Sequence, residues 1–358
     1  MNQPDRKQPP RVVHLLGGLR AIDVRSEQVV VQIAPNLPVL AIKTPEYAHL
    51  YAVLSRLSLT PIGVEFPNGL TMEGRMPPDW QAFFPGMGFR LMDERNAWSN
   101  IRHSASRDGE HAIRLVASKC VTYLDLLNIR LLQLSAAYSR TLRAQMFDGG
   151  KPHGFFSNGY MREIDAAVHA FLSDAGSFRD LVAEIVWRFV LKEPGQVTTL
   201  ATFLKKAKGS SLPLVRQILE AGKDGSWLHS FSELRNNIVH VAPVGRSQTF
   251  HYCELREIAV GADSKVPRLH YAVLGKDGRI WQDSGEDTDF NNEAAIKAAL
   301  EQYRAYFADS IDGLSFASQT IERMMALLTQ VRAATGFKGK MMTITDDDII
   351  GDIKVTRP

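Results

Sequence analysis

Cysteine is scarce in this sequence, which holds only Cys120 and Cys253, far apart along the chain. Neither cysteine belongs to a Cys-x-x-Cys pair or to another spacing typical of a metal or redox site, so we expect no disulfide framework and no zinc knuckle. The sequence also lacks an HExxH motif and an obvious cluster of carboxylates. We therefore expect no metal, no cofactor and a reducing compartment such as the cytoplasm.

A long hydrophobic run is also missing. Charged residues such as Asp125, Arg130 and Glu184 interrupt the most apolar helical stretches. The first residues, 1–11, are polar and proline-rich, whereas a signal peptide requires an apolar segment. We expect a soluble, cytoplasmic protein with no membrane partner.

The charge is only weakly biased, with a formal net charge of +3 and an isoelectric point near 8.8. This balance is compatible with a nucleic-acid substrate but far from that of a protein that coats DNA. Hydrophobic residues make up 45% and charged residues 23% of the 358 residues, as in ordinary globular proteins. A chain of this length predicts two or three structural units.

The N-terminal part, 1–95, predicts a small α/β domain. Short β-rich runs such as Val29 to Ile33 and Val39 to Ile42 alternate with turn residues, and one helical stretch follows Pro45. The glycines at 17–18 and 86–88 have neither the lysine nor the following helix of a phosphate-binding loop, so we interpret them as turns.

Residues 96–242 predict the first part of a helical bundle. After Ser99, apolar residues recur in steps of three and four, first from Ile113 to Tyr138 and again from Ile164 to Phe189. The first helix should end before Gly149 and Gly150. Two long amphipathic helices joined by a short loop are expected to pack antiparallel.

Shorter helices are predicted at 197–208 and 213–221, followed by a helix from Trp227 that Ser226 caps. On this last helix, one face is apolar and another carries a line of polar residues. The apolar face consists of Trp227, Phe231, Leu234, Ile238 and Val241, and the polar line consists of His229, Glu233, Asn236 and His240. Pro243 should terminate the helix.

Residues 243–291 predict a β-rich insertion, in which 271–274 and 279–282 flank a Lys276-Asp277-Gly278 turn suited to a hairpin. Helical periodicity resumes after a cap at Asn292 and continues through 292–338, with a break near Gly313. These C-terminal helices should complete the bundle. The last residues, 339–358, predict a tail.

The segment Arg235-Asn236-Asn237-Ile238-Val239-His240 carries the most specific pattern in the sequence. It resembles the active-site helix of HEPN-family ribonucleases, in which an arginine precedes a histidine by four to six residues and Asn, Asp or His often follows the arginine. The resemblance covers roughly 99–242 and 292–335. It implies a mainly α fold: a HEPN-like helical bundle, here with an N-terminal small α/β domain and a β insertion.

Two other segments match the bare spacing of arginine and histidine, Arg162 to His169 and Arg246 to His251. The acidic Glu163 follows Arg162 and would offset its charge, and Arg246 to His251 begins the β insertion, where no rigid helix holds both side chains. For Arg235 to His240, the alternative interpretation is an arginine paired with a carboxylate and an ordinary histidine near a helix end.

The resemblance implies that His240 takes the proton from an RNA 2′-hydroxyl or gives one to the leaving 5′-oxygen. Arg235 would hold the phosphate with its forked donors, and Asn236 would orient the histidine or the phosphate. One histidine cannot easily serve as both acid and base, which favours a homodimer. For His229 and Glu233 we expect surface or interface roles, with support of the site as the alternative.

The function that the resemblance implies is a metal-independent endoribonuclease, in a toxin or phage-defence setting, with RNA as its substrate. Such a setting admits an antitoxin or regulatory protein as a further partner. The first alternative is a non-catalytic HEPN module that binds RNA, nucleotide or a protein partner. The second is an unrelated helical interaction scaffold, in which no antiparallel helix pair would lie beside the Arg235 helix.

Overall fold

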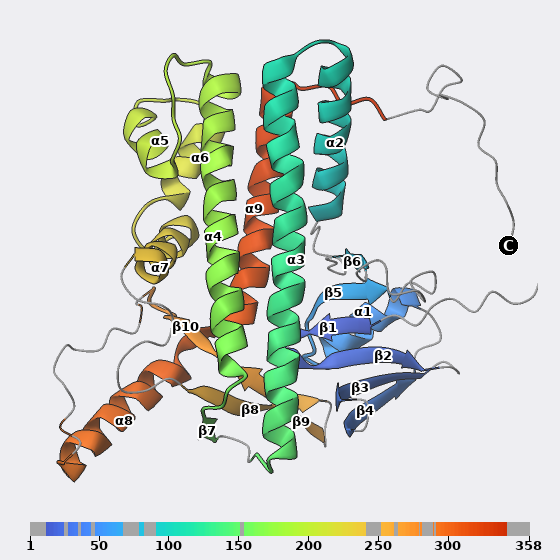
Figure 1. The fold of residues 1–358 in the computed structure, drawn as a ribbon, viewed down its shortest axis with the longest axis vertical. Helices are drawn as coiled ribbons and strands as arrows, with labels where there is room; N and C mark the ends of the chain where they lie inside the picture. The colour runs from blue at the N-terminus through green and yellow to red at the C-terminus, as the bar shows by residue number, and fades with distance from the viewer. Residues whose placement is uncertain are drawn as a thin grey trace, which may run out of the picture.

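The computed structural model is mostly helical, with a small antiparallel sheet near the N-terminus and further strands later in the chain. Figure 1 shows the long helices side by side, with the sheet against one end of them. The described residues are 12–24, 28–34, 37–43, 47–66, 79–81, 91–150, 154–240, 252–260, 264–278, 280, 289 and 291–341. Within these ranges, no helix has the length and apolar character needed to span a membrane.

The N-terminal sheet has six strands in the order β4-β3-β2-β1-β5-β6, and every pairing is antiparallel. The predicted runs from Val29 to Ile33 and Val39 to Ile42 lie within β3 and β4, and the helix expected after Pro45 is α1. The elements are β1 (Val12–Leu15), β2 (Arg20–Val24), β3 (Gln28–Ala34), β4 (Leu37–Lys43), α1 (Tyr47–Arg56), β5 (Pro61–Phe66) and β6 (Asp79–Gln81).

Four helices form the bundle: α2 (Leu91–Arg107), α3 (His111–Phe147), α4 (Met161–Ile185) and α9 (Gly313–Thr335). As predicted, α3 ends before Gly149 and carries its apolar residues on one buried face. α4 continues into a π-helical turn, Val186–Leu191. Figure 1 shows α9 behind α3 and α4, and its apolar face packs against α2, α3 and α4 to complete the core.

Helix α2 begins at Leu91, although the sequence predicts helical periodicity only after Ser99. A charged residue, Glu94, occupies a buried position on its inner face, so the apolar pattern is interrupted. Arg332 of α9 donates two hydrogen bonds of 2.9 Å to the Glu94 carboxylate, and the Thr329 hydroxyl donates a third of 2.8 Å. This pairing makes the burial of a carboxylate tolerable.

Three shorter helices follow α4: α5 (Leu200–Lys206), α6 (Pro213–Ala221) and α7 (Trp227–His240). Helix α7 begins at Trp227 as predicted, and the backbone carbonyl of Ser226 accepts from the Ser230 amide, but the Ser226 side chain does not act as the predicted cap. The Ser226 hydroxyl donates to the carbonyl oxygens of Ala221 and Lys223, so it satisfies the end of α6 instead of accepting from the first turn of α7.

The predicted β insertion contains strands that pair with distant segments. β8 (Cys253–Val260) and β9 (Ser264–His270) form a hairpin, and β7 (Phe155–Phe156) joins its edge. β10 (Ala272–Gly275) pairs with β11 (Ser310–Asp312), just before α9. Residues 279 and 281–282, expected to pair with 271–274, lie outside the described residues. Asn292 caps α8 (Glu293–Ala308) as predicted, accepting from the amides of Ala294 and Ala295.

A buried histidine joins the sheet to the bundle. His14 of β1 lies 2.9 Å from the Ser135 hydroxyl of α3 through Nδ1 and 3.1 Å from the Glu65 carboxylate through Nε2. The Gly17-Gly18 turn, which has positive φ at both glycines, lies against Arg268 of β9 and Tyr138 of α3. A Cβ on Gly18 would lie 2.8 Å from the Tyr138 carbonyl oxygen, so only glycine fits this contact.

His270 supports a prediction about acid stability. Its Nε2 lies 2.8 Å from the Ser310 oxygen, and the Ser310 hydroxyl donates to the Phe307 carbonyl. The ring must therefore donate from Nε2. Burial lowers the pKa of His270 from 6.5 to about 4, despite the opposing effect of Asp312. Between these values, the unfolded chain binds a proton that the folded protein does not, so stability falls as the pH drops from 6.5 towards 4.

We predict that His270→Gln removes the loss of stability that the buried histidine causes between pH 6.5 and 4. This loss amounts to about 3 kcal/mol of the free energy of unfolding, because one pKa unit corresponds to about 1.4 kcal/mol. Urea unfolding of both proteins at pH 8, 6, 5 and 4 measures the difference. The variant can be less stable at pH 8, but its loss on acidification should be smaller; an equal loss in both proteins would contradict the assignment.

Candidate functional site

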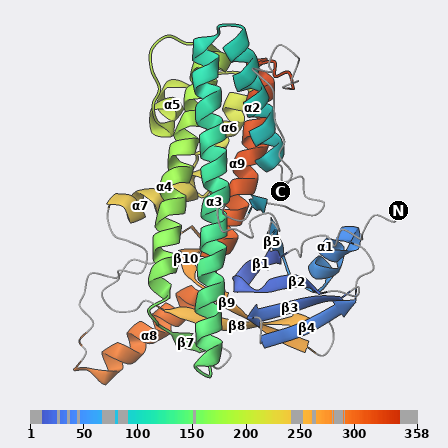
Figure 2. The same cartoon turned by 45° about the vertical axis from the view of Figure 1, so that its right-hand side comes forward.

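Helix α7 packs its apolar face onto the bundle and leaves its polar line outward. Leu228, Phe231, Leu234 and Ile238 are buried, and Phe231 stacks on Phe316 of α9 with ring centroids 6.4 Å apart. Figures 1 and 2 show α7 lying across the side of α4. The predicted apolar stripe is therefore confirmed at Phe231, Leu234 and Ile238, whereas Trp227 is half-buried and Val241 lies outside the described residues.

The three residues of the motif come together at the C-terminal end of α7. The Arg235 guanidinium donates from Nη1 to the Asn236 side-chain oxygen at 3.3 Å, and the same nitrogen lies 3.3 Å from Nε2 of His240. Asn236 and His240 are both exposed, whereas Arg235 is half-buried. The long arginine side chain thus reaches around the helix to the face that the other two residues share.

The contact between Arg235 and His240 leaves a ring nitrogen near the surface. A guanidinium group has donors only, so a hydrogen bond between the two side chains requires Nε2 of His240 as the acceptor. A ring nitrogen at an exposed position is chemically suited to exchange a proton with a bound substrate.

A glycine on α4 makes room for Arg235. A Cβ on Gly176 would lie 3.1 Å from Nε of Arg235 and 3.4 Å from its Cγ, which is closer than ordinary van der Waals contact. Nε of Arg235 is buried here and has no hydrogen-bond partner among the described residues. Because a glycine within a helix costs about 1 kcal/mol relative to alanine, its presence at this contact indicates that the space itself matters.

A second arginine fixes α7 to α4 one turn away. Arg179 donates 2.9 Å hydrogen bonds to the Ser232 hydroxyl of α7 and to Asp180 beside it, and its guanidinium lies 5.8 Å from the centroid of the Phe231 ring. Asp180 also accepts from the Leu200 amide at the start of α5. The position of α7 is thereby fixed by polar contacts as well as by its apolar face.

The two candidates for a supporting role do not join the motif. His229 lies 3.2 Å from the Asp224 carboxylate, near the start of α7 and about 16 Å along the helix from His240. Glu233 is exposed and makes no ion pair within the described ranges. Of the competing motifs, Arg162 and His169 are exposed on α4, and Arg246 and His251 lie outside the described residues.

A hollow of about 670 Å³ lies beside another face of α7, where Trp227 and Ser230 meet Phe316 and Arg323 of α9. Ser230 is about 140° around the helix from Arg235, at 100° per residue, so this hollow does not receive the motif side chains. Among the residues that the structure describes, no three His, Cys, Asp or Glu side chains gather as a metal site requires.

Comparisons with known proteins identify no relative: no model of a known family, no curated protein and no solved structure matches the chain. The geometry of the chain's own residues is therefore the basis for any functional conclusion.

The sequence predicts the contact among Arg235, Asn236 and His240, since all three lie on one helix. It does not predict the roles of Gly176 and Arg179, which depend on how α7 crosses α4. The only local signal for Gly176 is a glycine next to Ala175 in the middle of a long apolar stripe, a position where glycine weakens a helix.

Proposed function

We propose that the protein is a metal-independent endoribonuclease that cleaves RNA through the 2′-hydroxyl. The observation that carries this proposal is the convergence of a guanidinium, a carboxamide and an imidazole nitrogen at an exposed helix end, with Arg235 Nη1 3.3 Å from both partners. The antiparallel pair α3 and α4, with α7 packed against α4, matches the helix arrangement that the resemblance to HEPN ribonucleases implies.

The proposed reaction begins when a phosphate of the RNA binds to Arg235. The guanidinium then turns from His240 to the anion, which offers a stronger, charge-assisted hydrogen bond, and Nε2 becomes free to accept a proton. His240 removes the proton of the 2′-hydroxyl as the 2′-oxygen attacks the phosphorus atom. The bond from phosphorus to the 5′-oxygen breaks, so the products are a 2′,3′-cyclic phosphate and a protonated 5′-hydroxyl.

The leaving 5′-oxygen needs its own proton donor, because His240 has just become the acceptor of the 2′-proton. A second copy of the chain offers the simplest source: its own His240, in the protonated imidazolium form, would lie across a two-fold axis and give its proton to the 5′-oxygen. Leu115 and Ile129 of α3 are exposed apolar residues, at 57% and 46%, and suit an interface that includes the long helices. A toxin or phage-defence setting fits this activity, with an antitoxin or regulatory protein as its partner.

The first prediction from this proposal concerns the chemistry. Cleavage of RNA should persist in excess EDTA and leave 2′,3′-cyclic phosphate and 5′-hydroxyl ends, whereas DNA should remain intact because it lacks the nucleophile. His240→Ala should reduce the rate by about 10²- to 10⁴-fold and Arg235→Ala by about 10²- to 10³-fold. Asn236→Ala should lose less, since its side chain transfers no proton.

These outcomes are measured by incubating the purified proteins with a labelled RNA and identifying the ends of the fragments. Products with 3′-hydroxyl ends, or activity that EDTA abolishes and magnesium restores, would contradict the proposed chemistry. A folded protein that binds this RNA without cutting it would instead favour the non-catalytic alternative.

A second prediction tests Gly176 as a positioning residue. Gly176→Ala places a methyl group against the Arg235 side chain, so the guanidinium must shift by a few tenths of an ångström or more. We expect cleavage to fall between about tenfold and a hundredfold, because small displacements of catalytic groups are costly. The melting temperature should be unchanged or higher, since alanine favours the helix.

Ser177→Ala is the matched control for this prediction. Ser177 is the next residue of α4, and its hydroxyl only donates to the Ser173 carbonyl of the same helix. This control should retain full activity. If Gly176→Ala were as active as the control, the close approach of Arg235 to α4 would have no role in cleavage.

A third prediction concerns the partner copy. The protein should form a homodimer at micromolar concentration, with the polar line His229, Glu233, Asn236 and His240 near the two-fold axis. The cleavage rate per chain should then fall in parallel with the dimeric fraction on dilution, as measured by light scattering and RNA cleavage in one buffer. A monomer that cuts RNA at the full rate would contradict the two-copy mechanism.

A further inference from the structure

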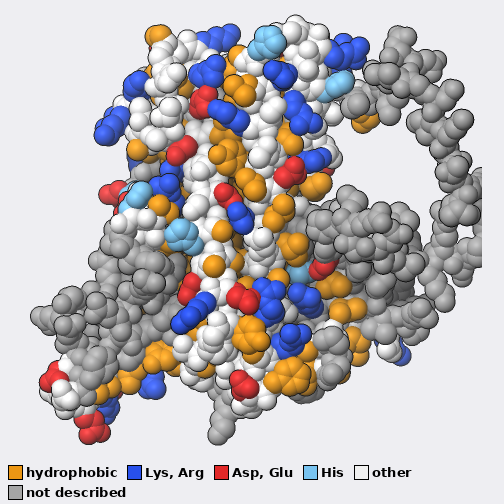
Figure 3. All heavy atoms as spheres, viewed as in Figure 1, with side chains coloured by type: hydrophobic (Ala, Val, Ile, Leu, Met, Phe, Trp, Pro, Cys, Tyr) orange, Lys and Arg blue, Asp and Glu red, His pale blue; other side chains and the backbone are white. Residues whose placement is uncertain are grey.

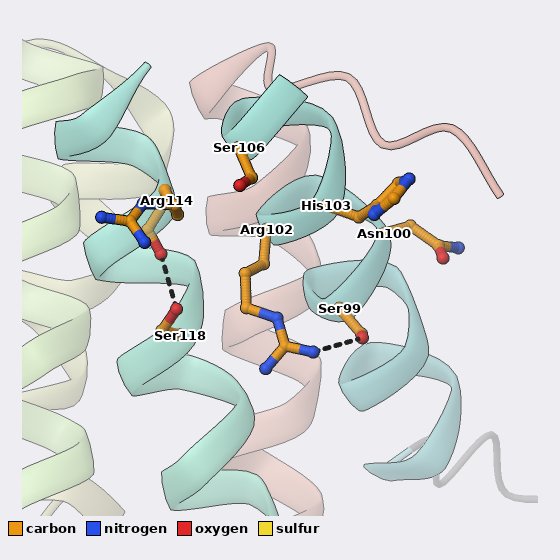
Figure 4. Close-up of a pocket in the computed structure, with 7 residues that line it drawn as sticks. All are labelled: Ser99, Asn100, Arg102, His103, Ser106, Arg114 and Ser118. Carbon is orange, nitrogen blue, oxygen red and sulfur yellow. Dashed lines mark hydrogen bonds between the residues drawn. The ribbon is translucent and has the colours of Figure 1, made fainter. Parts of the chain in front are cut away.

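A separate hollow of about 310 Å³ lies between α2 and α3, at the end of the bundle where a short turn connects them. It shares no residue with the motif on α7. Figure 4 shows Arg102 and Ser106 projecting from α2 towards α3, where Arg114 and Ser118 lie on facing turns. The lining residues are Ser99, Asn100, Arg102, His103, Ser106, Arg114 and Ser118.

This lining contains hydrogen-bond donors and positive charge but no carboxylate and no apolar side chain. Arg102 and Arg114 form no ion pair within the described part of the chain. By contrast, Arg95 of α2 pairs with Asp125, and Arg130 and Arg140 of α3 pair with Asp174 and Glu163. Within the described residues, Arg107 of α2 and Arg143 of α3 also form no ion pair, so Arg102 and Arg114 are distinguished by lining the same hollow.

The contacts inside the hollow leave most donors available. Arg102 uses one of its five N–H groups in a long 3.4 Å hydrogen bond to the Ser99 hydroxyl. Ser118 donates its only hydroxyl proton to the Arg114 carbonyl at 2.8 Å, so it cannot donate to a ligand. Figure 4 shows the Arg102 guanidinium beside Ser99 and the Arg114 guanidinium directed away from α2. Both keep free N–H groups of the kind that bind a tetrahedral oxyanion.

The segment after α9 adds positive charge beside α2. The Lys340 amide donates to the Ser104 hydroxyl at 2.9 Å, and a Cβ on Gly339 would lie 3.0 Å from Cβ of Asn100. This contact holds the backbone of two exposed lysines, Lys338 and Lys340, against α2. Figure 3 shows Lys and Arg side chains predominating over acidic ones at this end of the visible face.

We infer that this hollow binds a phosphate group carried by a larger ligand. The volume of this hollow, near 310 Å³, is at the lower end of the range for ligand sites and exceeds what inorganic phosphate alone would fill. Planar guanidinium groups match phosphate oxygens in pairs and bind them with charge-assisted hydrogen bonds. The phosphate belongs either to a free phosphorylated molecule of nucleotide size or to the backbone of a single strand of nucleic acid.

The test compares two probes with the full-length protein: AMP, and a ten-nucleotide single strand of DNA, which has no 2′-hydroxyl to react. Isothermal titration calorimetry gives the affinities, and thermal unfolding gives the accompanying rise in melting temperature. The test variant is Arg102→Gln with Arg114→Gln. The control, Lys205→Gln with Arg216→Gln, removes the same charge from exposed positions on α5 and α6.

We expect the test variant to bind at least about tenfold more weakly than the wild type and the control variant to bind like the wild type, because charge-assisted hydrogen bonds are lost only in the former. Binding of AMP identifies a free phosphorylated ligand, and binding of the DNA strand alone identifies a nucleic-acid backbone. The inference is overturned if neither probe binds the wild type, or if both double variants lose binding equally. His240→Ala should bind the probes normally, so this result is separable from the cleavage assay.

Discussion

The fold depends on one buried carboxylate. Asp312 accepts hydrogen bonds from the Tyr138 hydroxyl at 2.7 Å, the Tyr271 amide at 3.0 Å and the Ser315 amide at 3.0 Å. Burial and the adjacent Asp312 raise the pKa of Tyr138, so its hydroxyl remains a donor. A buried carboxylate is costly unless it is fully paired, so α3, the strand region and the start of α9 must meet at this point. The segment between α7 and α9 thereby rejoins the bundle at a defined position, the start of α9.

The candidate site on α7 depends indirectly on this packing, because α4 and α9 of the bundle hold α7 in place. α9 holds Phe316 against Phe231, and α4 provides both the space at Gly176 and the hydrogen bond from Arg179 to Ser232. The motif helix is therefore held from two sides, while Asn236 and His240 near its C-terminal end are exposed. Such support matters because the contacts of Arg235 with Asn236 and His240 are long, at 3.3 Å, and would not hold the side chains in place by themselves.

Local periodicity was sufficient to predict the helices whose apolar residues recur regularly, such as α3 and α4. It failed for the start of α2, where Glu94 is buried and satisfied by Arg332 of a helix more than two hundred residues away in the sequence. It failed also for β10, whose described partner, β11, follows the whole of α8. Within the site, the contact of Arg235 with His240 follows from spacing on one helix, whereas the fit against Gly176 arises only from packing between helices.

The position of α9 has a consequence for the order in which the chain can fold as it is synthesised. This helix lies in the core of the bundle, yet it is made after all the other described helices and strands. Until it leaves the ribosome, α3 and α4 expose the apolar surface that Leu314, Ile321 and Leu328 later cover. Domains generally fold as units once their chain is available, so an incomplete bundle is open to aggregation and to chaperone binding. A growing chain therefore already carries Arg235 and His240 before it has the core that holds them in place.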